Sequence, residues 1–145
     1  MLEMVITVAI IMVLATLAVP LLRDVSASFR FRGAVQAVTG AIQSTRYQAI
    51  YQGYSYQVVF DATAKTYQVQ SKPIGAAAFG NVGSAILWSE SAQQVTLNAN
   101  TTLTFSPGGK VTGAAACPCQ MTLSYPGKTP EVITVSAYGN INVTP

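Results

Sequence analysis

An uncharged apolar run near the N-terminus constrains the fold of this chain more than any other feature. The run extends over 19 residues, from Met4 to Leu22, and two threonines and Pro20 are its only interruptions. A helix of that length measures about 28 Å, which is close to the hydrocarbon thickness of a bilayer. We therefore expect residues 1–24 to form a membrane-spanning helix rather than part of a soluble core.

A cleaved secretory signal peptide is the alternative interpretation of this run. Signal peptides combine a basic start, about 7 to 15 apolar residues and a cleavage site made of small residues. Here the run is longer and no Lys or Arg precedes it, although the Ser-Ala-Ser segment at 26–28 could act as a cleavage site. The differences favour a helix that is retained.

The charges around the run indicate conflicting orientations. Arg23, Arg30 and Arg32 all follow it, and the positive-inside rule would place the C-terminal part in the cytoplasm. A strand-rich body with two neighbouring cysteines fits an exported domain better. A short basic leader before Met1 would reconcile the two observations.

The composition excludes most catalytic and nucleic-acid-binding classes of protein. The net charge of +3 is far from the dense basic stripe typical of nucleic-acid binding. The chain has no histidine, so it lacks the commonest general base and metal ligand. We expect no enzyme, no catalytic residue, no cofactor and no metal site. Only 9% of the residues are charged, so much of the surface should face lipid or protein.

The two cysteines, Cys117 and Cys119, are separated by a single proline. Two are too few for a disulfide framework, and the chain lacks the partners of a zinc site. They could form a strained local disulfide, a bridge to another chain or half of a metal site. We favour a local staple of the loop.

The segment LEMVITVAIIMVLATLAVP resembles the N-terminus of the type IV pilin and type II secretion pseudopilin family. In that family a processing glycine precedes Phe-Thr-Leu-Ile/Leu-Glu and an apolar helix that a proline interrupts. Glu3 and Pro20 are 17 positions apart, which is the usual spacing of that glutamate and proline. The leader, the processing glycine and the first two mature residues of the pattern are missing here.

The resemblance continues beyond the apolar run. The stretch from Leu21 to Val69 is similar to the H-type pseudopilin branch, which includes competence-type minor pilins and in which a long helix ends in an ARxEAI-like segment. The corresponding segment here is TRYQAI, at Thr45 to Ile50. Later, LTFSPGGKVTG and VITVSAYGNINV resemble the closing strands of that branch.

The resemblance implies a structural subunit of a type IV pilus or a type II secretion pseudopilus. It implies a single-pass location in the bacterial inner membrane with the β-domain in the periplasm, followed by assembly with other pilin or pseudopilin subunits into a filament that can be extracellular. Processing by prepilin peptidase is implied if a leader exists, and so is N-methylation.

The alternative is a DNA-binding minor pilin for natural transformation. Such relatives are expected to carry basic residues near the C-terminus, whereas no Lys or Arg follows Lys128, so we do not expect nucleic acid as a partner.

Glu3 is the candidate assembly residue. A carboxylate carried into lipid costs roughly 2.5 to 3.5 kcal/mol on insertion scales, although at the membrane surface it could simply mark the interface. In the family, the equivalent glutamate meets the N-terminal amine of a neighbouring subunit, which would reward one axial register over others. The resemblance therefore implies a set of subunit assembly residues, namely Glu3, Leu2, Val5, Ile6 and Pro20.

The predicted fold class is α+β. A long N-terminal helix, hydrophobic in its first half and kinked near Pro20, should pack on a small antiparallel β-domain. We expect a transmembrane or filament-core helix at 1–24 and a pilin-like domain at 25–145, with helix at 25–52 and sheet at 53–145. Apolar and small residues recur at helical spacing and predict the buried face of this helix: Val35, Val38, Ile42, Thr45 and Ala49.

Alternating residues after Gly53 predict strands separated by Gly- and Pro-containing turns. YSYQVVF and KTYQVQ should form a hairpin, and further strands are expected at AILW, QVTL, TLTF, QMTLSY, EVITVS and NINV. The Gly/Ala-rich stretch from Lys72 to Ala85 is expected to be an exposed loop that could contact neighbouring subunits. Aromatic residues near the end of the helix are expected in the core, namely Tyr47, Tyr51, Tyr54, Tyr56 and Trp88.

Overall fold

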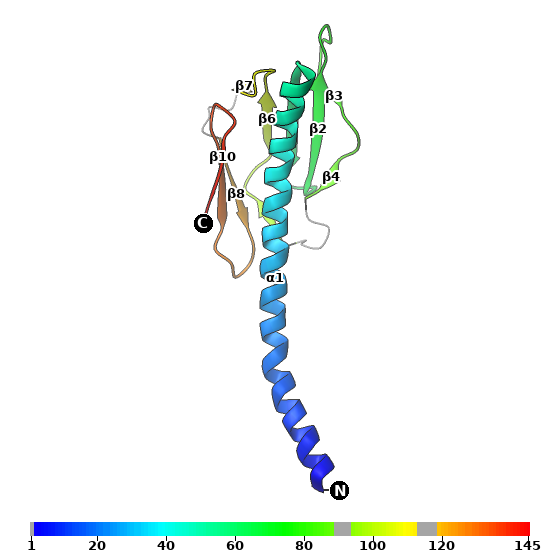
Figure 1. Cartoon of the computed structure of the whole chain (residues 1–145), viewed down its shortest axis with the longest axis vertical. Coiled ribbons are helices and arrows are strands. Elements are labelled where there is room, and N and C mark those ends of the chain that lie inside the picture. Colours follow the sequence, from blue (N-terminus) through cyan, green and yellow to red (C-terminus); the bar gives the residue numbers. More distant parts are fainter. Residues whose placement is uncertain (1, 89–93, 113–118) are drawn as a thin grey trace.

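A single long helix organises the molecule. The computed structural model describes residues 2–88, 94–112 and 119–145, without the side chains of residues 2, 15 and 17–21. Helix α1 (Leu2–Gln52) contains 51 residues, and only its C-terminal half lies against the β-strands, while the N-terminal half projects alone (Figure 1). The helix bends in its blue, N-terminal part (Figure 1) and is helical throughout, including at Pro20. The domain boundary at residue 24 stays a prediction.

The two ends of α1 are stabilised in different ways. Glu3 lies in the first turn, where the partial positive charge of the helix dipole favours a carboxylate. At the other end, Gly53 adopts a φ of 72°, and its N–H donates to the carbonyl of Ala49 over 3.1 Å. Glycine is the residue that reaches this left-handed conformation without steric cost, so it stops the helix and turns the chain into the first strand.

The larger sheet has six strands, with the order β3-β2-β1-β6-β7 and β4 paired to β2. Its strands are β1 (Ser55–Asp61), β2 (Thr66–Lys72), β3 (Gly80–Asn81), β4 (Ile86–Leu87), β6 (Thr101–Phe105) and β7 (Val111–Thr112). The predicted hairpin is confirmed, because β1 pairs antiparallel with β2 from Ser55 opposite Lys72 to Asp61 opposite Thr66. The loop predicted from Lys72 to Ala85 includes the short strand β3, which the sequence analysis missed along with β7.

The smaller sheet has four antiparallel strands in the order β10-β9-β8-β5. Its strands are β5 (Thr96–Leu97), β8 (Cys119–Ser124), β9 (Glu131–Val135) and β10 (Ile141–Thr144). Each of them overlaps a predicted run, with β8 beginning one residue before its run and β10 ending one residue after, so the antiparallel β-domain and the α+β class are confirmed. In Figure 1 the smaller sheet lies on one side of the upper part of α1, and the larger sheet extends from β6 and β7 on that side to β2, β3 and β4 on the other.

The hydrophobic core lies between α1 and the two sheets. The five helix residues predicted to face it are all buried, and Val38, Ile42 and Thr45 are fully so. The Thr45 hydroxyl donates to the carbonyl of Ala41 over 2.7 Å, which satisfies a polar group that would be costly to bury alone. The sheets contribute buried side chains from alternate positions of their strands, among them Val58, Phe60, Leu103, Phe105, Met121, Leu123, Ile133 and Val135.

The predicted aromatic core is only half right. Trp88 and Tyr56 are buried, and Tyr54 is partly buried against the core. Tyr47 and Tyr51 are 69% and 77% exposed, so the prediction for these two is wrong. They lie two residues after Thr45 and Ala49, and two residues turn about 200° around a helix, which points both rings away from the core. Their rings stack on each other with centroids 6.3 Å apart.

Arg46 joins α1 to both sheets through two turns of the same kind. The turns are Ser106–Lys110 and Ser136–Asn140, and in each the N–H of the fourth residue, a glycine, donates to the serine carbonyl. Gly109 and Gly139 both have positive φ, as hairpin loops of this length require. The Arg46 Nε donates to the carbonyl of Gly109 over 3.0 Å. A hydrogen bond of 3.0 Å from Val111 to Ala137 links the two hairpins directly.

Replacing Gly139 with alanine should destabilise the fold more than the same change at Gly127. Both glycines have a φ near +75°, but a Cβ at Gly139 would lie 2.7 Å from the Gly109 carbonyl oxygen and 2.7 Å from the Arg46 Nε, whereas one at Gly127 would meet nothing within 4 Å. We expect a loss of about 1 kcal/mol for Gly127→Ala from backbone strain alone and on the order of 3 kcal/mol for Gly139→Ala, where overpacking adds to that strain. Urea unfolding of the full chain in detergent, followed by Trp88 fluorescence, measures both losses, and equal losses would contradict the Arg46 packing.

Tyr56, which follows α1, contacts a neighbouring tyrosine through its hydroxyl and its ring. The hydroxyls of Tyr54 and Tyr56 are 3.2 Å apart, and their rings stack at 5.2 Å. The hydrogen bond to Tyr54, together with burial, raises the pKa of Tyr56 from 10.0 to about 12. Between these two values the folded chain keeps a proton that the unfolded chain releases, so stability present below pH 10 is lost as the pH rises toward 12.

Tyr56→Phe should reduce the loss of stability in strong alkali. We expect the free energy of unfolding to fall less between about pH 9 and about pH 12 in this variant than in the unmodified chain, because the shifted proton is gone. Denaturant titrations followed by circular dichroism at both pH values measure the difference. Tyr138→Phe, which removes an exposed hydroxyl, is the matched control and should follow the unmodified chain.

Candidate subunit interface

The N-terminal half of α1 exposes apolar side chains on every face. The large hydrophobic residues from Met4 to Leu14 are each between 50% and 74% exposed. Only Thr7 and Ala9 interrupt them, so the segment has no polar face. A helix that is apolar all round is normally buried in protein or in a membrane, and an exposed apolar surface of this extent marks an interaction site.

A membrane span is not shown by the structure. Within the described part of the chain, no helix combines the length and the apolarity that crossing a membrane requires.

The free end of α1 carries four of the five predicted assembly residues, namely Leu2, Glu3, Val5 and Ile6, whereas Pro20 lies farther along the helix. Glu3 is exposed, and Val5 and Ile6 next to it are exposed as well. The side chains of Leu2 and Pro20 lie outside the described residues. Figure 1 shows that this end is the part of the molecule farthest from the sheets. The structure leaves Glu3, Val5 and Ile6 accessible, and the role of the predicted set in assembly stays a prediction.

An ion pair ties the middle of α1 to the smaller sheet. The Lys128 Nζ lies 2.6 Å from the Asp24 Oδ1. Lys128 closes a turn in which its N–H donates to the carbonyl of Tyr125 over 3.1 Å, and Gly127 supplies the positive φ. The Asp24 side chain is 70% exposed, so the pair stabilises the fold by at most about 1 kcal/mol. Its effect is to fix where the β8–β9 turn meets the helix.

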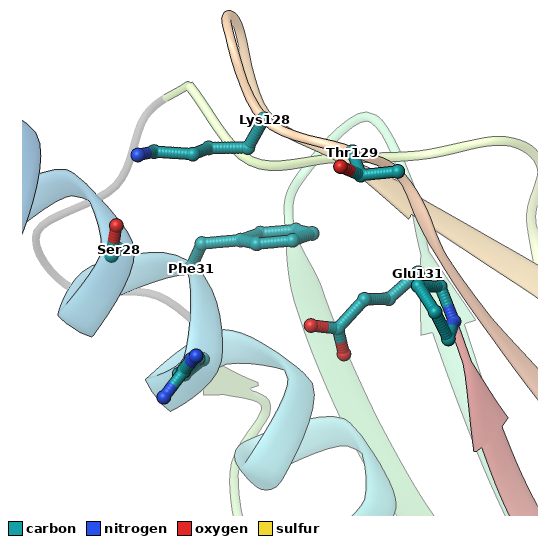
Figure 2. Close-up of a pocket in the computed structure, with 7 residues that line it drawn as sticks. Ser28, Phe31, Lys128, Thr129 and Glu131 are labelled. Carbon is teal, nitrogen blue, oxygen red and sulfur yellow. The ribbon is translucent and has the colours of Figure 1, made fainter.

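A shallow pocket of about 210 Å³ lies beside this ion pair. It is lined by Ser28, Phe31, Arg32, Lys128, Thr129, Glu131 and Pro145. Figure 2 shows the Phe31 ring extending from the helix toward the strands, with Lys128 above it and the Glu131 carboxylate on its other side. Charges of both signs line the pocket, and Arg32 is exposed. The pocket therefore fits a junction between helix and sheet better than a site for one class of ligand.

The remaining predicted sites give the following picture. Among the described residues, no group of three or more His, Cys, Asp or Glu could hold a metal ion. Cys119 begins β8 and is buried, whereas Cys117 lies outside the described residues. The pairing of the two cysteines stays a prediction.

A second, larger groove runs along α1 beside β2 and was missed by the sequence analysis. Its volume is about 390 Å³, and its lining residues are Gln36, Ala37, Gly40, Ala41, Ser44, Gln48, Tyr67, Val69, Val82 and Ile86. None of them is charged. Small residues at helical spacing, Ala37, Gly40, Ala41 and Ser44, were the available signal, because they leave room that larger side chains would fill. The Gln48 Oε1 is buried and has no hydrogen-bond partner in the described part of the chain.

Comparison with known proteins finds similarity in structure alone. No protein-family model and no curated protein sequence matches the chain. The type IV minor pilin FimU of Pseudomonas aeruginosa matches with a TM-score of 0.59 and 18% identity, over 79% of this chain and 88% of FimU. The minor pseudopilin EpsH of the Vibrio cholerae type 2 secretion system matches with a TM-score of 0.60 and 13% identity, over 79% of this chain and 96% of EpsH.

This chain has the fold of FimU and EpsH. The likeness confirms the predicted pilin-like arrangement of a long helix on antiparallel sheets. It does not distinguish an H-type competence branch, since a pilus protein and a secretion protein match about equally well.

Proposed function

We propose that this protein is a structural, non-enzymatic subunit of a type IV pilus or a type II secretion pseudopilus. Two observations support the proposal: the fold is shared with a minor pilin and a minor pseudopilin, and the large apolar side chains of α1 from Met4 to Leu14 are uncovered. The uncovered apolar segment is the stronger of the two observations. An isolated soluble domain gains nothing from holding such a helix in water, whereas a filament subunit needs it.

The cost of leaving this half uncovered indicates how strongly it must associate. Each large apolar side chain contributes roughly 1.5 to 3 kcal/mol when it moves from water to an apolar environment. From Met4 to Leu14 several such side chains act together, so the total is on the order of 10 kcal/mol or more. We propose that lipid of the bacterial inner membrane covers the helix before assembly and that neighbouring subunits cover it in the filament.

Glu3 would set the position of each subunit in that assembly. A carboxylate at the tip of an apolar helix is costly among apolar neighbours unless a positive group meets it. In the proposed filament, the N-terminal amine of an adjacent subunit is that group. A subunit displaced along the filament axis would leave Glu3 unpaired, so pairing selects one register.

Glu3→Gln should therefore impair assembly while leaving membrane association intact. The substitution keeps the size of the side chain and removes its charge, so we expect incorporation into sheared filaments to fall at least tenfold, as measured by immunoblot of the filament fraction. Membrane fractions of the same cells should contain unchanged amounts of the protein.

Glu131→Gln is the matched control, because it also removes one carboxylate but lies on β9 of the smaller sheet. It should assemble normally. Filaments that contain Glu3→Gln at the level of the unmodified chain would contradict the role of the carboxylate.

A further inference from the structure

We infer that the groove between α1 and the β2–β4 edge receives the apolar N-terminal half of α1 from a second copy of this chain. The inference rests on the proposed function, since it names the surface against which one subunit holds the helix of another. The occupant is specified as the segment Met4–Leu14, and the acceptor as the groove lined by Gln36, Gly40, Ser44 and Gln48 on one side and by β2 and β4 on the other.

The chemistry of the groove suits an uncharged partner. All ten lining residues are uncharged. Its outer edge is apolar as well, because Val82, Ile86 and Leu87 are between 41% and 51% exposed. A charged peptide would lose its hydration there without gaining an ionic partner, whereas the segment Met4–Leu14 carries no charge.

The groove also continues into the apolar half along one face of α1. Nine exposed residues at three- and four-residue spacing form an uncharged stripe on the side away from the core: Leu22, Val25, Phe29, Gly33, Gln36, Gly40, Gln43, Tyr47 and Tyr51. The stripe is about 44 Å long at 1.5 Å per residue. It begins at Leu22, on the same helix and C-terminal to the apolar segment Met4–Leu14, so another helix lying along α1 could contact both.

Two glycines in the stripe are not required by any contact among the described residues. A Cβ at Gly33 or Gly40 would meet nothing within 4 Å, and neither position has the positive φ that favours glycine. Each glycine weakens the helix relative to alanine, so an unaided subunit would be better served by alanine. Close approach of a second helix accounts for both, because glycine lets two helix backbones come nearer than any other residue does.

The dimensions of donor and acceptor agree. The groove follows α1 from Gln36 to Gln48, which is about 18 Å, and the segment Met4–Leu14 is about 15 Å long as a helix. Side chains such as Ile6 and Ile10 would fit between the side chains that line the groove, as in ordinary ridges-into-grooves helix packing. The Thr7 hydroxyl, which donates to the Met4 carbonyl in the free subunit, is the donor in this segment that can turn toward the Gln48 Oε1.

A bulky substitution at Gly40 tests the acceptor. Gly40→Phe would fill the groove from an exposed position, so we expect the isolated subunit to fold normally, as Trp88 fluorescence and thermal unfolding in detergent report. Incorporation into filaments should drop at least tenfold in cells that assemble the unmodified chain. Gln52→Phe adds the same ring at an exposed position of α1 outside the groove and should assemble normally.

Cross-linking in the filament tests the occupant directly. A benzophenone amino acid in place of Gly40, activated in assembled filaments, should capture a peptide containing Met4–Leu14 of another copy, identified by mass spectrometry. The same probe at Gln52 is the control and should not capture that peptide. Capture of a different segment, capture of a different subunit, or no capture would overturn the inference, even if Gly40→Phe failed to fold.

The outcomes separate this inference from the proposed function. Filaments that contain the unmodified chain and equally contain Gly40→Phe would overturn the groove contact and leave the proposed function standing. A chain that enters no filament at all in its own cells would overturn both.

Discussion

The packing of one face of α1 against two sheets determines the rest of this structure. Val38, Ile42, Thr45 and Ala49 are buried on that face. The larger sheet contacts α1 through β1, β2 and β6, and the β8–β9 turn of the smaller sheet contacts it at Asp24. The sheets end before the helix does. The same helix therefore belongs to the core at its C-terminal end and exposes an apolar surface at its N-terminal end. The proposed assembly would cover that exposed surface.

The sequence predicted the features whose pattern lies within a single segment of the chain. The buried face of α1 repeats at helical spacing, and β1 and β2 alternate and are joined by a short turn, so both could be predicted. The strands β3 and β7 have two residues each and exist only because β2 and β6 offer them a partner. Tyr47 and Tyr51 were misplaced because aromatic character indicates burial on average, whereas their position on the helix directs them outward.

The candidate interface was predicted in part for the same reason. The apolar run and Glu3 are local features, but the groove beside β2 depends on residues from α1, β2 and the loop before β4, which lie far apart in the chain. Arg46 similarly meets Gly109 and Gly139 only after three segments have folded together. The residue spacing within any one of these segments does not predict such tertiary contacts. The glycines themselves do indicate that other atoms approach the backbone closely.

The continuity of α1 has a mechanical consequence. A helix from Leu2 to Gln52 is about 75 Å long and connects the projecting end to the β-domain without a flexible linker. Tension applied at the projecting end would travel along the backbone hydrogen bonds of the helix. It would first reach the smaller sheet at the Asp24–Lys128 pair and then Arg46, where hairpins from both sheets are attached. Both sheets would thus bear the load together, and no single strand would be pulled off its sheet alone. This property suits an element that is pulled along its length.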